Sequence, residues 1–181
     1  KNLGKVAPDW TMGISNTLRY RNLSLSFLID VRYGGVMYSG TVSDLRVNGM
    51  AEETIGKNRT DIVDKGVKQD GTENTTAITP YQFWSNNYSS KVSEANVFDA
   101  TFVKLREMVL SYQMPQRWFK NCFIGSLALG VEGRNLWLMK SNVPHIDPET
   151  NIFGPSAVGS GVEYSAIPTT RSWGFNIKLT F

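Results

Sequence analysis

The sequence has few of the residues on which catalytic and metal sites usually depend. Among its 181 residues there is one cysteine, Cys122, and one histidine, His145. A single cysteine excludes an intrachain disulfide and a thiolate metal cluster. A lone loop histidine is a weak indication of catalysis or metal binding, and it provides no basis for a Ser-His-Asp triad. The sequence therefore predicts no enzyme activity, no cofactor and no metal site.

Charge and long apolar runs are also scarce. Charged residues make up 19% of the chain, and the net charge of +3 comes from scattered basic residues that form no run. This distribution argues against nucleic-acid binding. No run of about 18 apolar residues occurs, which excludes a transmembrane helix. The opening Lys1-Asn2-Leu3-Gly4 lacks the apolar region of a signal peptide, so we expect a mature chain or a fragment.

Aromatic residues and glycine are plentiful, and they occur in a strand-like pattern. Aromatics account for 12% of the chain, and there are 16 glycines. From Ser172 onward apolar and polar residues alternate strictly, which predicts a strand with one apolar face. The apolar residues of this last strand are Trp173, Phe175, Ile177, Leu179 and Phe181.

Four earlier segments repeat this alternation, so five strands of one design are predicted. Their expected ranges are 10–20, 23–33, 102–113, 126–137 and 171–181. Strands of about ten residues with one apolar and one polar face are typical of outer-membrane β-barrels. The predicted fold class is therefore all-β, an antiparallel transmembrane β-barrel.

The third strand breaks the alternation between Leu105 and Met108. Regular pairing would turn Lys104 and Arg106 toward lipid, at a cost of about 2–4 kcal/mol each near the midplane. One extra residue restores the apolar face and turns the charges away from it. We therefore predict a β-bulge at Arg106-Glu107.

The connections alternate between short and long, as they do in outer-membrane barrels. The tight connections are Arg21-Asn22 and the stretch from Met114 to Phe123, in which Pro115 favours a helical turn. Two long loops near 36–97 and 139–167 are expected to be extracellular, the first with at most a short helix near Val42 to Glu53. Five strands cannot close a barrel, so we expect the chain to be part of a larger one.

Several ordered motifs resemble the C-terminal third of the SusC/RagA family of TonB-dependent transporters. They are Ala7-Pro8-Asp9-Trp10, Phe27-Leu28-Ile29-Asp30 with Arg32 and Gly34-Gly35, the stretch from Asp99 to Glu107, Gly133-Arg134-Asn135-Leu136, Asp147-Pro148-Glu149, and the ending from Pro168 and Arg171 to Phe181. Each motif is weak alone. Together they span nearly the whole chain in the family's order.

The resemblance implies a 22-stranded barrel in the Gram-negative outer membrane, of which this chain supplies the last five strands. It also implies an N-terminal plug that contacts TonB and a SusD-like surface lipoprotein that acts as a lid. Family members import glycans or peptides. The plug and the TonB-contacting segment lie outside this sequence.

Three groups of residues are candidates for function. Aromatic residues of the first long loop suit glycan stacking or contact with a lid protein, although packing within the loop would also explain them: Tyr81, Phe83, Trp84 and Tyr88. Charges on the polar strand faces could contact solute or pair across the wall: Asp30, Arg32, Lys104, Glu107, Glu132 and Arg134. The alternating terminal strand ending at Phe181 resembles the signal read by the barrel-assembly machinery.

Aromatic residues near the strand ends are expected to form a girdle at the lipid interface: Trp10, Tyr20, Tyr33, Tyr112, Trp137 and Trp173. Two other protein classes remain open at this point. One is a soluble β-sandwich carbohydrate-binding module with Trp84 and Tyr81 as its platform. The other is a structural outer-membrane barrel without transport activity.

Overall fold

The computed structural model describes residues 1–56, 60–120, 123–152 and 160–181, so Cys122 lies outside the described residues. The chain divides into two compact units, each assembled from segments that are far apart in the sequence. The sheet unit consists of Pro8–Gly34, Ala100–Asn142 and Thr169–Phe181. The loop unit consists of Lys1–Ala7, Gly35–Asp99 and Val143–Pro168.

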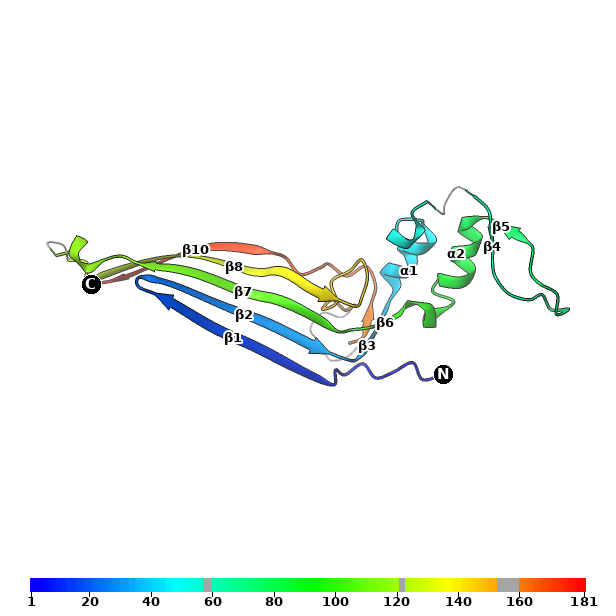
Figure 1. Cartoon of the computed structure of the whole chain (residues 1–181), viewed down its shortest axis with the longest axis horizontal. Helices are drawn as coiled ribbons and strands as arrows, with labels where there is room; N and C mark the ends of the chain where they lie inside the picture. The colour runs from blue at the N-terminus through cyan, green and yellow to red at the C-terminus, as the bar shows by residue number, and fades with distance from the viewer. Residues whose placement is uncertain (57–59, 121–122, 153–159) are drawn as a thin grey trace. The chain divides into compact units, whose positions relative to one another are not determined.

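Five antiparallel strands form the sheet unit, in the order β1-β2-β7-β8-β10 (Figure 1). Their bounds are β1 Trp10–Tyr20, β2 Leu23–Tyr33, β7 Phe102–Gln113, β8 Ser126–Ser141 and β10 Ser172–Thr180. β8 continues beyond residue 137, where the sequence pattern placed its end. A 3-10 turn, η3 Gln116–Trp118, follows Pro115 in the connection between β7 and β8.

The strand register places the apolar residues opposite one another across the whole sheet. One row runs from β1 to β10 through Leu18, Leu25, Leu110, Val131 and Phe175. Because side chains alternate between faces, aligned apolar rows give the sheet one apolar face and leave the polar residues on the other.

The predicted β-bulge at Arg106-Glu107 is confirmed. On β7 Leu105 pairs with Ile29 and Glu107 pairs with Leu28, so Arg106 is the extra residue between two consecutive partners on β2. The register with β8 shifts at the same place. The bulge keeps Leu105 in an apolar row and Glu107 in a polar one, as the parity argument requires.

Among the described residues of the sheet unit, none covers the apolar face of the sheet. Phe175 is 86% exposed, and Leu18, Trp137, Trp173 and Ile177 are also largely exposed. A continuous apolar surface of this kind marks contact with lipid or another protein. A β-sandwich needs a second sheet packed on this face, so the sandwich alternative does not fit the five-stranded sheet.

The loop unit is folded around small sheets of its own. β3 Val36–Ser39 pairs antiparallel with β6 Val97–Asp99 and parallel with β9 Val162–Glu163, which comes from the second long loop. β4 Ile62–Val63 pairs with β5 Ala77–Ile78. The parallel pairing joins the two long loops into one folded unit.

The expectation of at most one short helix near Val42 to Glu53 is wrong. The loop unit contains two α-helices, α1 Gly40–Val47 and α2 Pro80–Tyr88 (Figure 1), and the 3-10 turns η1 Glu52–Thr54 and η2 Ser93–Asn96. α2 begins with a capping box, in which Thr79 and Gln82 satisfy each other's backbone N–H groups. No helix in the described ranges is long and apolar enough to cross a membrane.

Candidate functional site

The four predicted loop aromatics all lie on α2, but they differ in how far they are exposed. Trp84 is 5% exposed, and its ring lies 4.8 Å from the ring of Tyr88. Phe83 contacts Trp84 edge-on at 5.3 Å. These three rings pack against one another inside the loop unit, as the packing interpretation of the sequence anticipated.

Tyr81 is the member of the set that faces solvent, with 64% of its surface exposed. It borders two hollows in the surface of the loop unit. The first hollow, of about 250 Å³, lies between the end of α1 and the start of α2 and is also lined by Asn48 and Trp84. The second, of about 380 Å³, is lined by Ser85, Asn86 and other polar residues. Tyr81 is therefore the exposed aromatic of this surface.

Arg46 of α1 holds the interior of the loop unit together. Its guanidinium lies over the rings of Tyr88 and Phe98, 5.1 and 5.3 Å from their centroids. It also donates hydrogen bonds to Glu53 Oε1, the carbonyl of Ala95 and Asn96 Oδ1. Stacking and hydrogen bonding to one cation fix α1 against the segment that follows α2.

Glu53 links Arg46 to His145 of the second long loop. Its carboxylate accepts from Arg46 Nε at 2.6 Å and lies 2.8 Å from His145 Nε2. Burial by itself raises the pKa of Glu53, but the hydrogen bonds from Arg46 and His145, helped by a backbone hydrogen bond and the charge of Arg46, lower it to about 2. No local sequence pattern indicates this contact, because the two residues are 92 positions apart.

The low pKa of Glu53 predicts how the loop unit responds to acid. A carboxyl group whose pKa is depressed in the folded state stabilises that state above its unfolded pKa, and this contribution is lost as pH falls through the folded pKa. We expect the Glu53→Gln variant to be cleaved by pepsin faster than the wild type at pH 4.5. The difference in cleavage rate between Glu53→Gln and the wild type should narrow toward pH 2. If the ratio of the variant's cleavage rate to that of the wild type stays constant between pH 4.5 and pH 2, the depressed pKa of Glu53 is contradicted.

Glu163 is the most buried charged side chain among the described residues, at 1% exposed. Its carboxylate accepts hydrogen bonds from the hydroxyls of Ser39 and Thr41, both at 2.6 Å, and from the backbone N–H of Ala166 at 3.2 Å. Ser39 is also the N-cap of α1, accepting from the N–H of Val42. Glu163 therefore ties the second long loop to the start of the first helix.

Tyr164 lies close to the same junction. Its ring sits over Gly40, where an added Cβ would lie 2.0 Å from Tyr164 Cδ2, so only glycine fits at the start of α1. A hydrogen bond to Asp44, together with the charge of that residue, raises the pKa of Tyr164.

The predicted lumen charges lie on β2, β7 and β8, and the structure brings several of them together. Asp30 forms an ion pair with Arg106, the bulge residue. Arg134 Nε lies 3.9 Å from Glu107 Oε2 on the neighbouring strand, and Arg134 Nη2 lies 4.0 Å from Glu132 Oε1 on its own strand.

The other two predicted charges lie nearer the end of the sheet that leads to the loops. Lys104 is 3% exposed and donates to Thr169 Oγ1 at 3.1 Å, and Arg32 lies opposite Phe102. Within the described residues no group of three or more His, Cys, Asp or Glu side chains is placed to hold a metal ion.

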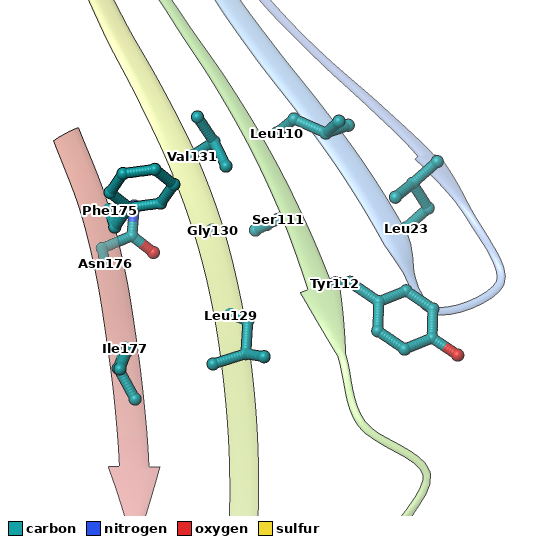
Figure 2. A pocket seen from close by; sticks show the side chains of 10 residues that line it. All are labelled: Leu23, Leu110, Ser111, Tyr112, Leu129, Gly130, Val131, Phe175, Asn176 and Ile177. Carbon is teal, nitrogen blue, oxygen red and sulfur yellow. The ribbon is translucent and has the colours of Figure 1, made fainter. Parts of the chain in front are cut away.

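The apolar face of the sheet is hollowed near the tight-turn end. Figure 2 shows apolar side chains of four strands around this hollow of about 460 Å³, among them Leu110, Val131, Phe175 and Ile177. All five residues of the predicted assembly signal are exposed: Trp173, Phe175, Ile177, Leu179 and Phe181. At the opposite end of the sheet the predicted girdle residues Trp10 and Tyr33 stack at 5.2 Å.

Comparisons with known proteins identify the fold to which these units belong. No family model matches the chain. TonB-dependent receptors P3 and P26 of Formosa agariphila are 25% and 26% identical to it over 185 and 182 residues, covering 100% and 99% of this chain. The RagAB peptide importer in its open-open state superposes with a TM-score of 0.64 and 20% identity over 97% of this chain. The chain is SusC/RagA-like.

This SusC/RagA-like chain corresponds to a part of those proteins. It spans 17% and 18% of the two receptors and 17% of the importer chain. In the closed-closed state of the RagAB peptide importer the TM-score is 0.58. The predicted antiparallel β-barrel fold, of which this chain supplies a portion, is confirmed.

Proposed function

We propose that the chain is the C-terminal segment of an outer-membrane TonB-dependent nutrient importer. The observation that carries this proposal is the exposed apolar face, which extends across five strands of bilayer-spanning length. The opposite face carries ion-paired charges, as suits a wall between lipid and an aqueous lumen. These strands are the last five of the 22-stranded barrel that the family resemblance implies.

The loop unit is the extracellular part in this proposal. The two tight connections and the end of β10 lie at one end of the sheet, while both long loops leave from the other. Outer-membrane barrels place short turns in the periplasm and long loops outside. The loop unit would therefore meet incoming glycan or peptide and a SusD-like surface lipoprotein. The name of the RagAB peptide importer supports transport of such an oligomer.

Two further roles belong to the proposal. The polar-face charges line the lumen, where they pair mainly with one another. The exposed alternation ending at Phe181 serves as the signal for the barrel-assembly machinery, and its terminal ring stacks on Phe123 at 5.8 Å. TonB acts through the plug region, which belongs to the rest of the protein.

Fractionation and uptake by the full-length protein test this function. We expect the protein in the outer-membrane fraction, soluble only with detergent, and copurifying with a surface lipoprotein. Cells that express it should accumulate a fluorescent oligosaccharide or peptide from a mixed panel only when TonB is present. Solubility without detergent would contradict the barrel. An outer-membrane protein without TonB-dependent uptake of any probe would instead be a structural barrel.

A further inference from the structure

We propose that the surface around Tyr81, at the start of α2, is a subsite for a neutral oligosaccharide. This inference rests on the proposed import function and narrows its substrate class from glycan or peptide to glycan. The subsite consists of the Tyr81 ring and the two hollows on either side of it. Its residues come from α1, α2 and the turn that follows α2.

The fold holds Tyr81 in a defined orientation. The capping box and Pro80 fix the first turn of α2, so Tyr81 lies in a well-anchored part of the helix. Trp84 and Tyr88 follow three and seven residues after Tyr81 on the same side of α2, where their rings pack against each other, whereas Tyr81 lies in the first turn and is exposed. The same helical spacing places Ser85 one turn after Tyr81, and both residues line the second hollow. An aromatic ring that is already positioned loses little conformational entropy when a ligand stacks on it.

The first hollow has no charged side chain in its lining. Asn48 lies at the end of α1, and its amide Nδ2 already donates to the carbonyl of Asp44 at 2.8 Å. An amide Oδ1 in this lining can accept a hydrogen bond from a ligand hydroxyl. The end of a helix carries a partial negative charge, which disfavours carboxylates and phosphates and suits neutral donors.

The second hollow is lined mainly by hydroxyl and amide groups. Ser85 and Asn86 of α2 contribute a hydroxyl and an amide group to this lining. The two charged residues of the lining, Asp44 and Lys91, have opposite signs. Neutral donors and acceptors beside an exposed aromatic ring match the vicinal hydroxyls and the apolar ring face of a sugar.

The volumes fit one oligosaccharide that crosses Tyr81. The hollows, of about 250 and 380 Å³, lie at or below the low end of the roughly 300–1,000 Å³ typical of pockets for drug-sized ligands. Each therefore suits a single small unit of a chain. A peptide would be expected to use charges for its termini or a free strand edge, and the first hollow has neither in its lining.

Binding to the full-length protein in detergent tests the subsite. Probes are arrays of neutral oligosaccharides four to six sugars long and of peptides of similar length. We expect binding to at least one oligosaccharide, reduced about tenfold by Tyr81→Ala because ring stacking is lost, and retained by Tyr81→Phe. The matched control is Ile55→Ala, which removes another exposed apolar side chain of the loop unit and should leave affinity unchanged.

Several outcomes would overturn the subsite. They are oligosaccharide binding that Tyr81→Ala leaves unchanged, Tyr81-dependent binding of peptides only, and no oligosaccharide binding by the wild type. TonB-dependent uptake, measured in parallel, separates the two proposals. TonB-dependent peptide uptake without oligosaccharide binding would contradict the proposed subsite and support the proposed import function. Oligosaccharide binding that depends on Tyr81, without TonB-dependent uptake, would support the proposed subsite and contradict the proposed import function.

Discussion

Deleting Arg106 is expected to abolish assembly of the barrel. The deletion removes the extra residue of β7, so the residues before it would move to the opposite face relative to those after it. Lys104, buried on the polar side with its amine on Thr169, would then point toward lipid, at a cost that ranges from about 1 kcal/mol near the interface to about 4 kcal/mol at the midplane. Val103 and Leu105 would leave the apolar rows at the same time.

The substitution Arg106→Gln is the matched control for this deletion. It removes the ion pair with Asp30 but keeps the residue count and therefore the register. We expect the heat-modifiable folded band on electrophoresis to be nearly complete for Arg106→Gln and to fall below about a tenth for the deletion, given a cost of several kcal/mol. Equal folded fractions for the two variants would show that the bulge does not set the parity of β7.

Replacing Glu163 by Ala is expected to release the two long loops from each other. The change leaves the hydroxyls of Ser39 and Thr41 and the N–H of Ala166 without their buried acceptor. Hydrogen bonds to a charged group contribute about 1.5–3 kcal/mol each. We expect the loop unit to lose about 3 kcal/mol of local stability, which corresponds to backbone amide exchange about 100-fold faster in α1 and β3.

Hydrogen exchange followed by mass spectrometry on the full-length protein measures this effect. Glu52→Ala is the control, because Glu52 is an exposed carboxylate near the end of the same loop segment. Its exchange should match the wild type. Amides of the sheet unit should be unchanged in both variants. Similar exchange of α1 in Glu163→Ala and Glu52→Ala would refute the role of Glu163 as the tie between the loops.

The main strands and the bulge were readable from the sequence because their signals are local or nearly so. The alternation of apolar and polar residues along Ser172–Thr180 predicts a strand directly. The break in that alternation between Leu105 and Met108 predicted the extra residue. β8 ran four residues past the expected end because the register with β7 shifts twice in this stretch, between Val103 and Lys104 and between Leu105 and Glu107. Such irregularities break the strict alternation on which the prediction depended.

α2 was missed although its signal was present. Thr79-Pro80-Tyr81-Gln82 combines an N-cap threonine, a proline at the first helical position and a glutamine at the third, which together predict a helix start. The aromatic cluster was noticed, but helical spacing alone would not have separated its members, because Tyr81, Trp84 and Tyr88 lie on one side of the helix. Tertiary packing buries Trp84 and leaves Tyr81 exposed.

The sequence by itself determined the strands, their apolar and polar faces and the bulge, because backbone geometry makes neighbouring side chains alternate. Tertiary structure alone decided the organisation of the loops. The contacts of Glu163 with Ser39 and Thr41 span 124 and 122 positions, and Glu53 meets His145 across 92. No local pattern encodes such pairs, because a buried carboxylate and an exposed one look alike until folding supplies the donors. The same reason makes Tyr81, rather than Trp84, the ring that a ligand can reach.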